Sequence, residues 1–190
     1  EPAVDEPVRD AREDDATADI LAIFDPLPEG LNGLLGTLHR DEAPTVHFLH
    51  MLLPHTPYAH LPTGEPYTSI DGLSEVGLVQ GDDPAGNVRG PAQEAADFDR
   101  YRMLLQAGYA DRLVGHLLRR LHRTALYDDA LVVVTADHGI SFTAGQPKRT
   151  PTDATVDEIY RVPMIIRVPG QREGEVSDEN ALNTDILPTI

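Results

Sequence analysis

The chain has 190 residues, 41% of them hydrophobic, a formal net charge of -17 at pH 7 and no cysteine. This length is enough for one domain with a real core. The acidic charge argues against binding to nucleic acid and against adhesion to an anionic membrane surface. No apolar run reaches the ~18 residues of a membrane span, so we expect no direct insertion of this chain into a membrane.

The first segment of the chain is strongly acidic. Residues 1–19 hold eight acidic residues against two arginines, a balance that does not favour a packed structure. We therefore predict an acidic flexible tail or linker over residues 1–15, followed by a domain over residues 16–190. Two short helices are expected next, over residues 16–24 and 31–40, with a break rich in proline and glycine between them.

An apolar run over residues 45–53 predicts a strand that ends at a loop bracketed by prolines. The loop reads Pro-His-Thr-Pro-Tyr, and it contains His55 and Tyr58. The prolines restrict the backbone on either side of the histidine. Such a rigid loop suits residues that must meet a substrate. The alternative is a surface turn in which the histidine is incidental.

The middle of the chain predicts an irregular excursion and then a long helix. Residues 58–90 are rich in Gly, Pro and Asp, and we expect a small hairpin near residues 72–79 or a functional flap, with a plain surface excursion as the alternative. Pro91 suits a helix start, and apolar residues recur from there to Leu121 at helical spacing. His116 falls on the apolar face of this helix, which favours a packed histidine over a ligand.

The run over residues 131–135 is apolar without alternation, which predicts a buried, parallel strand. Asp137 and His138 follow at the carboxyl end, where open α/β sheets place their chemistry. A carboxylate oxygen beside an imidazole nitrogen is half of a divalent metal site. Gly139 permits a sharp turn or a close approach to a ligand. The alternative is a solvated turn.

The last part of the chain predicts a polar loop, an edge strand and a final helix. The loop over residues 140–156 contains Lys148 and Arg149, the adjacent basic pair nearest in sequence to the Asp-His motif. In an acidic protein, such a cation stands out as a potential partner for an anion. Prolines bracket the strand predicted over residues 162–168, which suits an edge position. Thr184 is expected to cap the last helix.

Taken together, these motifs resemble the sulfatase-like family of the alkaline phosphatase superfamily. Five elements match in the family's order, over roughly residues 45–190. They are PHTPY at 54–58, the helix segment from Tyr109 to Leu121, the strand and Asp-His-Gly motif at 127–139, VPMIIRVPG at 162–170 and DILPTI at 185–190.

The resemblance implies an α/β fold, a three-layer α/β/α sandwich around a mixed, mostly parallel sheet, present here as a partial domain. It implies a metal-dependent hydrolase of sulfate or phosphate esters. Asp137 and His138 would be two ligands of one divalent metal ion, and His55 would be the catalytic contact to the transferred group. Tyr58 and Lys148 would bind the anionic ester substrate. Oxygen and nitrogen ligands without a thiolate suit Mn, Mg or Ca.

The nucleophile of the family is not identifiable in this chain. There is no cysteine, and nothing before Pro54 resembles the family's nucleophile motif or its first acidic ligand. We therefore expect the upstream half of the same domain as a partner, and we expect this fragment to be inactive by itself. Gly115 stands four residues after Asp111, where a two-metal enzyme would have a histidine. This favours a one-metal site, with Asp111 in a structural role.

Three functions stay open at this point. The first is a sulfatase-type ester hydrolase, and the second is a transferase that moves a phospho-headgroup onto an envelope lipid or polymer. The third is a non-catalytic interaction module built on the same fold. A Cys-x-Pro-x-Arg motif upstream would favour the first, and a threonine after an acidic ligand would favour the second. By resemblance, we expect an extracytoplasmic domain of a membrane-anchored bacterial protein.

Overall fold

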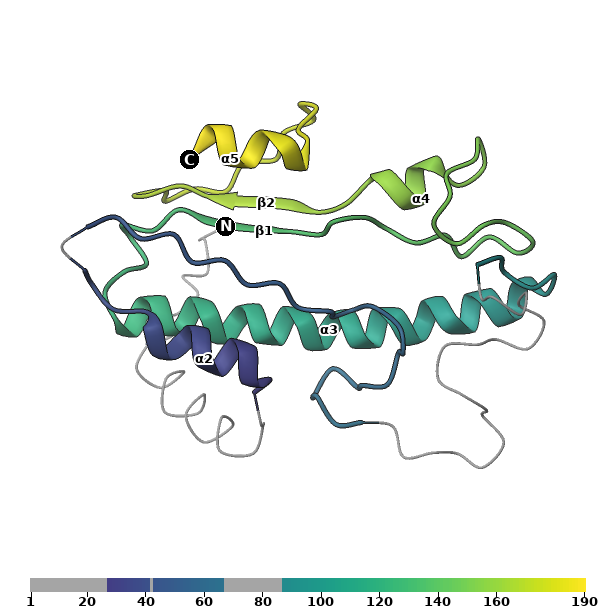
Figure 1. Ribbon diagram of the computed structural model, residues 1–190, viewed down its shortest axis with the longest axis horizontal. Coiled ribbons are helices and arrows are strands. Elements are labelled where there is room, and N and C mark those ends of the chain that lie inside the picture. Colours follow the sequence, from purple (N-terminus) through teal and green to yellow (C-terminus); the bar gives the residue numbers. More distant parts are fainter. Residues whose placement is uncertain (1–26, 42, 67–86) are drawn as a thin grey trace, which may run out of the picture.

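The computed structural model describes residues 27–41, 43–66 and 87–190 (Figure 1). The acidic tail, the first short helix and the small hairpin predicted from the sequence lie outside these residues. Within the described ranges, no helix is both long and apolar enough to cross a membrane. Helices and a two-stranded sheet make up the described part, in agreement with the predicted α/β class.

The longest element is the helix α3 (Gln93–Arg123), along which the other elements are arranged (Figure 1). It begins two residues after Pro91, whose missing N–H costs nothing at a helix start. Basic residues fill its last turn, where positive charge complements the helix dipole. His116 is buried on this helix. The predicted helix, with its packed histidine, is confirmed to within two residues at each end.

A small apolar core lies between α3 and the shorter helix α2 (Glu29–Thr37). Leu31 of α2 packs with Tyr109 and Leu113 of α3. Partly buried side chains from α2 and the segments around it complete this core: Leu27, Leu34, Leu35, Leu49, Met51 and Leu53. The second predicted helix is therefore present, although it starts two residues and ends three residues earlier than expected.

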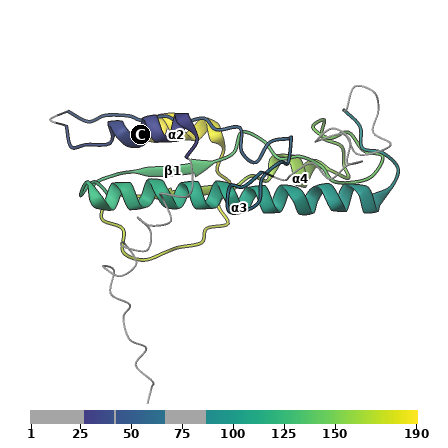
Figure 2. The same cartoon turned by 90° about the horizontal axis from the view of Figure 1, so that it is seen from below.

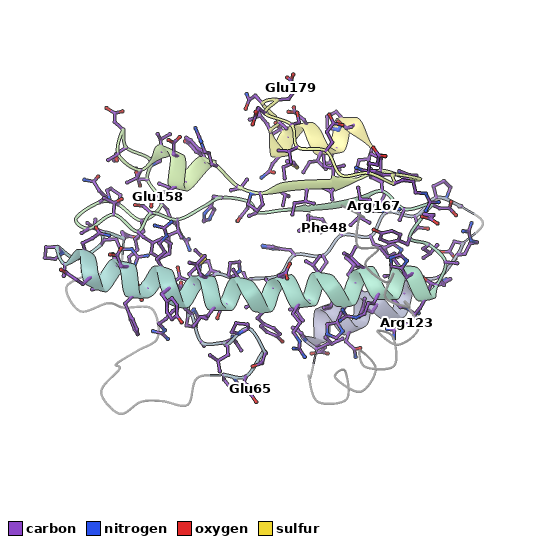
Figure 3. The ribbon with its side chains drawn as sticks, turned by 180° about the vertical axis from the view of Figure 1, so that it is seen from behind. Phe48, Glu65, Arg123, Glu158, Arg167 and Glu179 are labelled. Carbon is purple, nitrogen blue, oxygen red and sulfur yellow. The ribbon has the colours of Figure 1, made fainter. Side chains whose placement is uncertain are left out.

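The segment over residues 45–53 is extended and runs along α3 in both views (Figures 1 and 2). The strand predicted here is wrong, because no strand among the described residues pairs with it. Side chains still alternate with the two-residue period of a strand. Leu49 and Met51 face the core, whereas Phe48, labelled in Figure 3, is 87% exposed. The alternating pattern of residues favours an extended backbone, but a β-strand also requires a partner strand to which it can form hydrogen bonds.

The sheet consists of β1 (Val132–Thr135) and β2 (Met164–Arg167). They pair antiparallel, with Val132 opposite Arg167. The expectation of a buried, parallel strand over residues 131–135 is therefore corrected in two respects. The pairing that the described residues give to β1 is antiparallel, and its side chains are at most partly buried. The chain turns back after β1 and returns beside it, which produces an antiparallel pair.

Two short helices complete the described structure. Helix α4 (Val156–Tyr160) lies between the two strands in sequence, and α5 (Ile186–Thr189) follows the 3-10 turn η1 (Asn183–Asp185). Thr184 does not cap the last helix as expected. It lies inside η1, and Asp185 precedes α5, because the chain first tightens into the 3-10 turn. The described residues hold one two-stranded sheet, so they do not outline three layers.

Candidate active site

His55 lies in a short loop that is hydrogen-bonded to α3. Its backbone N–H donates to the carbonyl of Leu52 at 2.6 Å, and its own carbonyl accepts from Nε2 of Gln106 at 2.8 Å. The ring nitrogen Nδ1 lies 2.5 Å from the carbonyl oxygen of Thr56. Because a carbonyl oxygen only accepts, this contact assigns a proton to Nδ1. In the neutral ring, Nε2 therefore presents a lone pair.

The Nε2 atom of His55 contacts the guanidinium group of Arg149, from a segment far along the chain. Arginine only donates hydrogen bonds, which matches the lone pair on this nitrogen. Both side chains are exposed, so a ligand can reach them. The sequence offered Lys148 and Arg149 as alternatives for an anion-holding cation, and Arg149 is the one that meets His55. A guanidinium group beside an imidazole forms a suitable site for an oxyanion.

Lys148 is buried next to an ion pair that lies inside the protein. The pair joins NH1 of Arg89 to Oδ2 of Asp99 at 2.7 Å, and neither side chain is more than 3% exposed. Nε of Arg89 also donates to the carbonyl of Ser141 at 3.0 Å, and its guanidinium lies 4.5 Å from the centre of the Phe142 ring. Lys148 is close enough for its charge to act on Asp99. Its substrate-binding role stays a prediction.

Tyr58 is 1% exposed, so the structure places it inside the protein. Its carbonyl accepts from Arg102 at 2.7 Å, and its ring centre lies 6.4 Å from that of Phe142. Burial raises the pKa of the Tyr58 phenol above its ordinary value of 10.0, although the positive charge of Arg89 opposes this shift. Contact between Tyr58 and a substrate stays a prediction.

The loop that follows β1 is held by α4. Oε2 of Glu158, which is labelled in Figure 3, accepts from Oγ of Ser141 at 2.8 Å and from the N–H of Phe142 at 3.2 Å. The N–H of Gly139 donates to the carbonyl of Ile159 at 2.7 Å. A Cβ atom at Gly139 would lie 2.0 Å from the carbonyl oxygen of Glu158. This glycine therefore serves a close approach between two backbone segments.

Asp137 and His138 lie just beyond the end of β1. Oδ1 of Asp137 accepts from the backbone N–H of His138 at 2.9 Å, and Oδ2 lies 3.7 Å from Nε2 of His138. Desolvation raises the pKa of the Asp137 carboxyl, but the hydrogen bond from His138 and the charges of His138 and His50 outweigh it, so the pKa is lowered. The carboxylate is therefore ionised at neutral pH, as metal binding requires.

The donor chemistry of this pair fits one side of a divalent metal site. Oδ2 of Asp137 and Nε2 of His138 lie 3.7 Å apart, and a carboxylate oxygen with an imidazole nitrogen is a donor set that Mn, Mg or Ca accepts. In the part of the chain that the structure describes, no group of three or more His, Asp or Glu side chains could hold a metal ion. Asp137 and His138 are thus a partial ligand set.

The predicted site residues form two groups in the structure. His55 and Arg149 meet each other, and Asp137 and His138 meet each other, but no hydrogen bond or ion pair joins the two groups within the described ranges. Asp111 is exposed on α3. One residue with a direct effect on the loop, Gln106, was missed. Its position three residues before Tyr109 on the buried helix face would have revealed it.

Comparison with known proteins identifies the family. The family model named Sulfatase matches residues 22–190, nearly the whole chain, and the chain therefore belongs to the sulfatase family. The chain is also similar to the ulvan-active sulfatase of Formosa agariphila, with 28% identity over 169 residues. This match covers 85% of the present chain but 30% of the relative. No solved structure matches.

Proposed function

We propose that this chain contributes the anion-binding part of the active site of a sulfatase-like hydrolase that acts on sulfate esters. The observation that supports this most directly is the contact between His55 and Arg149. The two residues come from segments on either side of α3 in sequence, and both segments are fixed to the protein by hydrogen bonds. Membership of the sulfatase family agrees with this proposal.

The contact suggests a different role in substrate binding for each of the two side chains. An incoming sulfate group would take the guanidinium of Arg149 as a partner for one or two of its oxygens, which frees Nε2 of His55. Once protonated there, His55 would keep its bond from Nδ1 to Thr56 and donate from Nε2 to an ester oxygen. The ring is oriented for this by the Thr56 carbonyl, so little reorganisation is needed.

Asp137 and His138 would hold one side of a divalent cation, for which Mn, Mg and Ca are the candidates. When bound, such a cation supplies charge neutralisation at the ester oxygens and lowers the pKa of a nucleophile. The remaining ligands and the nucleophile would come from the upstream half of the same domain. In that complete domain, β1 and β2 would belong to a larger mixed sheet within a three-layer sandwich. The fragment by itself would be inactive.

Two further expectations carry over as proposals. We propose that the parent protein is bacterial and membrane-anchored, with this domain outside the cytoplasm, which cell fractionation of the source organism would test. The transferase of phospho-headgroups and the non-catalytic module remain the alternatives. A transferase would prefer phosphate to sulfate esters, whereas a module would hydrolyse neither.

The proposal is tested in the full-length protein with 4-nitrophenyl sulfate and 4-nitrophenyl phosphate as substrates. His55→Ala and Arg149→Ala should each lower kcat/KM for the sulfate ester by about 10²-fold or more, because each removes a donor to the reacting group. Arg161→Ala is the matched control, since Arg161 is an exposed arginine whose ion pair among the described residues is with Asp157, four residues earlier. The control should keep the parent rate.

A full-length protein that hydrolyses the sulfate ester equally well with and without His55 would contradict the proposal. Preference for the phosphate ester would instead support the transferase alternative. Thermal unfolding of each variant separates a lost catalytic contact from a lost fold, because both target side chains are exposed and their removal should change the unfolding free energy by less than about 0.5 kcal/mol.

A further inference from the structure

Gln106 directs its whole side-chain amide at the backbone of the loop that contains His55. It lies on α3 and is 1% exposed. Its Oε1 accepts from the N–H of Ala59 at 2.8 Å and from the N–H of His60 at 3.2 Å. Its Nε2 donates to the carbonyl of His55 at 2.8 Å. One buried side chain is therefore hydrogen-bonded to the loop both before and after Tyr58.

We propose that Gln106 is a positioning residue that holds His55 in front of Arg149. This inference rests on the proposed function, because it assigns Gln106 to the same anion site. The His55 ring is exposed and gains little from packing, so its place is set by the backbone that carries it. That backbone is fixed by two bonds: the N–H of His55 donates to Leu52, and its carbonyl accepts from Gln106.

A second glutamine on the same helix, Gln93, forms the same kind of hydrogen bonds with the backbone of the loop that follows β1 and leads to Arg149. Nε2 of Gln93 donates to the carbonyl of Phe142 at 3.0 Å, and its Oε1 accepts from the N–H of Ala144 at 2.9 Å. The two glutamines lie about 20 Å apart along α3, at a rise of 1.5 Å per residue. The same helix, α3, is thus hydrogen-bonded to both the loop of His55 and the loop that leads to Arg149.

Gln106→Met and Gln106→Glu separate the hydrogen bonds that Oε1 accepts from the hydrogen bond that Nε2 donates. Methionine has a similar length and removes the three hydrogen bonds to the backbone, together with the contact between Oε1 and Nδ1 of His60 at 3.3 Å. In its ionised form, the glutamate carboxylate still accepts from Ala59 and His60 but cannot donate to the carbonyl of His55, so the pH is set above the titration of this carboxyl, whose pKa burial raises. Gln171→Met is the matched control. Gln171 also bridges backbone groups, those of Val168 and Glu173, in the turn after β2.

The experiment has two readouts in the full-length protein, labelled at histidine and arginine for NMR. The first needs no ligand: it is the contact between the His55 ring and the Arg149 guanidinium. The second is the dissociation constant of inorganic sulfate, followed at the His55 ring. The first tests the positioning role, and the second tests the proposed function.

In both Gln106 variants, the His55–Arg149 contact should be lost, and the dissociation constant of sulfate should rise about 10- to 100-fold. In a separate hydrogen-exchange control on uniformly labelled protein, the Ala59 and His60 amides should stay protected in Gln106→Glu and lose protection in Gln106→Met. Gln171→Met should match the parent in every respect.

An unchanged His55–Arg149 contact in Gln106→Glu would overturn the positioning role, and this variant decides the question if Gln106→Met does not fold. If the parent shows the contact but sulfate does not perturb His55, the proposed function fails. The ligand-free contact in the variants then still decides the role of Gln106, so the two failures are distinguishable.

Discussion

The two halves of the candidate site are supported in opposite ways. The loops of His55 and Arg149 are joined to α3 and α4 by polar side chains, among them the buried Gln106 and the half-buried Glu158. The Asp137–His138 pair follows a two-stranded sheet with partly buried side chains, and the Asp137 side chain is 73% exposed. The contact between His55 and Arg149 is therefore supported within the described residues, whereas the Asp137–His138 pair is supported by them only in part.

The largest effect on the free energy of unfolding is expected from the buried ion pair of Arg89 and Asp99, next to the loop that leads to Arg149. Asp99→Ala leaves Arg89 buried and uncompensated, and should lower the free energy of unfolding by about 3–5 kcal/mol. The control is the exposed pair of Arg40 and Asp129, for which Asp129→Ala should cost at most about 1 kcal/mol. Chemical denaturation measures both. Equal losses in the two variants would show that burial does not distinguish the pairs.

Gly139 links the two halves, since it follows Asp137 and His138 and its N–H donates to the carbonyl of Ile159 in α4. Gly139→Ala places a Cβ against the carbonyl of Glu158 and should cost about 1–3 kcal/mol through forced backbone shifts. Gly33→Ala is the control, because a Cβ there meets nothing within 4 Å inside helix α2. That change should instead stabilise the protein by about 0.5–1 kcal/mol. A tolerated Gly139→Ala would contradict the close approach.

The pH dependence of stability tests the burial of Tyr58. In the unfolded chain, this phenol loses its proton near its ordinary pKa of 10.0, but in the folded protein its pKa is raised by burial. Above pH 10 the unfolded state therefore binds fewer protons, and stability falls as the pH rises through the folded pKa. Unfolding free energies measured from pH 9 to 11.5 should fall less steeply in Tyr58→Phe. Identical slopes would argue against the buried phenol.

The smallest effect on stability, with a clear effect on binding, is expected at the metal-ligand pair. Asp137→Asn removes an exposed carboxylate and should change the unfolding free energy by less than about 0.5 kcal/mol in the absence of metal. In the full-length protein, the same change should weaken Mn²⁺ binding by about tenfold or more, because an amide is a poorer ligand than a carboxylate. Isothermal titration calorimetry measures this. Unchanged affinity would remove Asp137 from the ligand set.

How much the sequence predicts differs between elements for physical reasons. Helix α3 was predicted to within two residues, because helical periodicity and Pro91 are local features. The strand over residues 45–53 was not, because a strand also requires a partner, and none of the described residues provides one. The antiparallel direction of β1 follows from where the chain returns, which no local pattern encodes.

The site shows the same division. Asp137 and His138 are neighbours in sequence, so their proximity was evident from the start. Adjacent residues point in different directions, so the contact between Arg149 and His55 and the burial of Lys148 emerged only from the structure. The spacing from Tyr109 indicates that Gln106 is on the same helix face, but its hydrogen bonds to the His55 loop emerge only from the structure. Long-range contacts, rather than motifs, set these positions.

The most direct test of the central claim is a crystal structure of the full-length protein with inorganic sulfate. The proposed function predicts a sulfate ion between Nε2 of His55 and the guanidinium of Arg149, with Asp137 and His138 on the same cavity as ligands of a divalent cation. A sulfate ion bound elsewhere in the active site, with His55 and Arg149 still paired to each other, would contradict it.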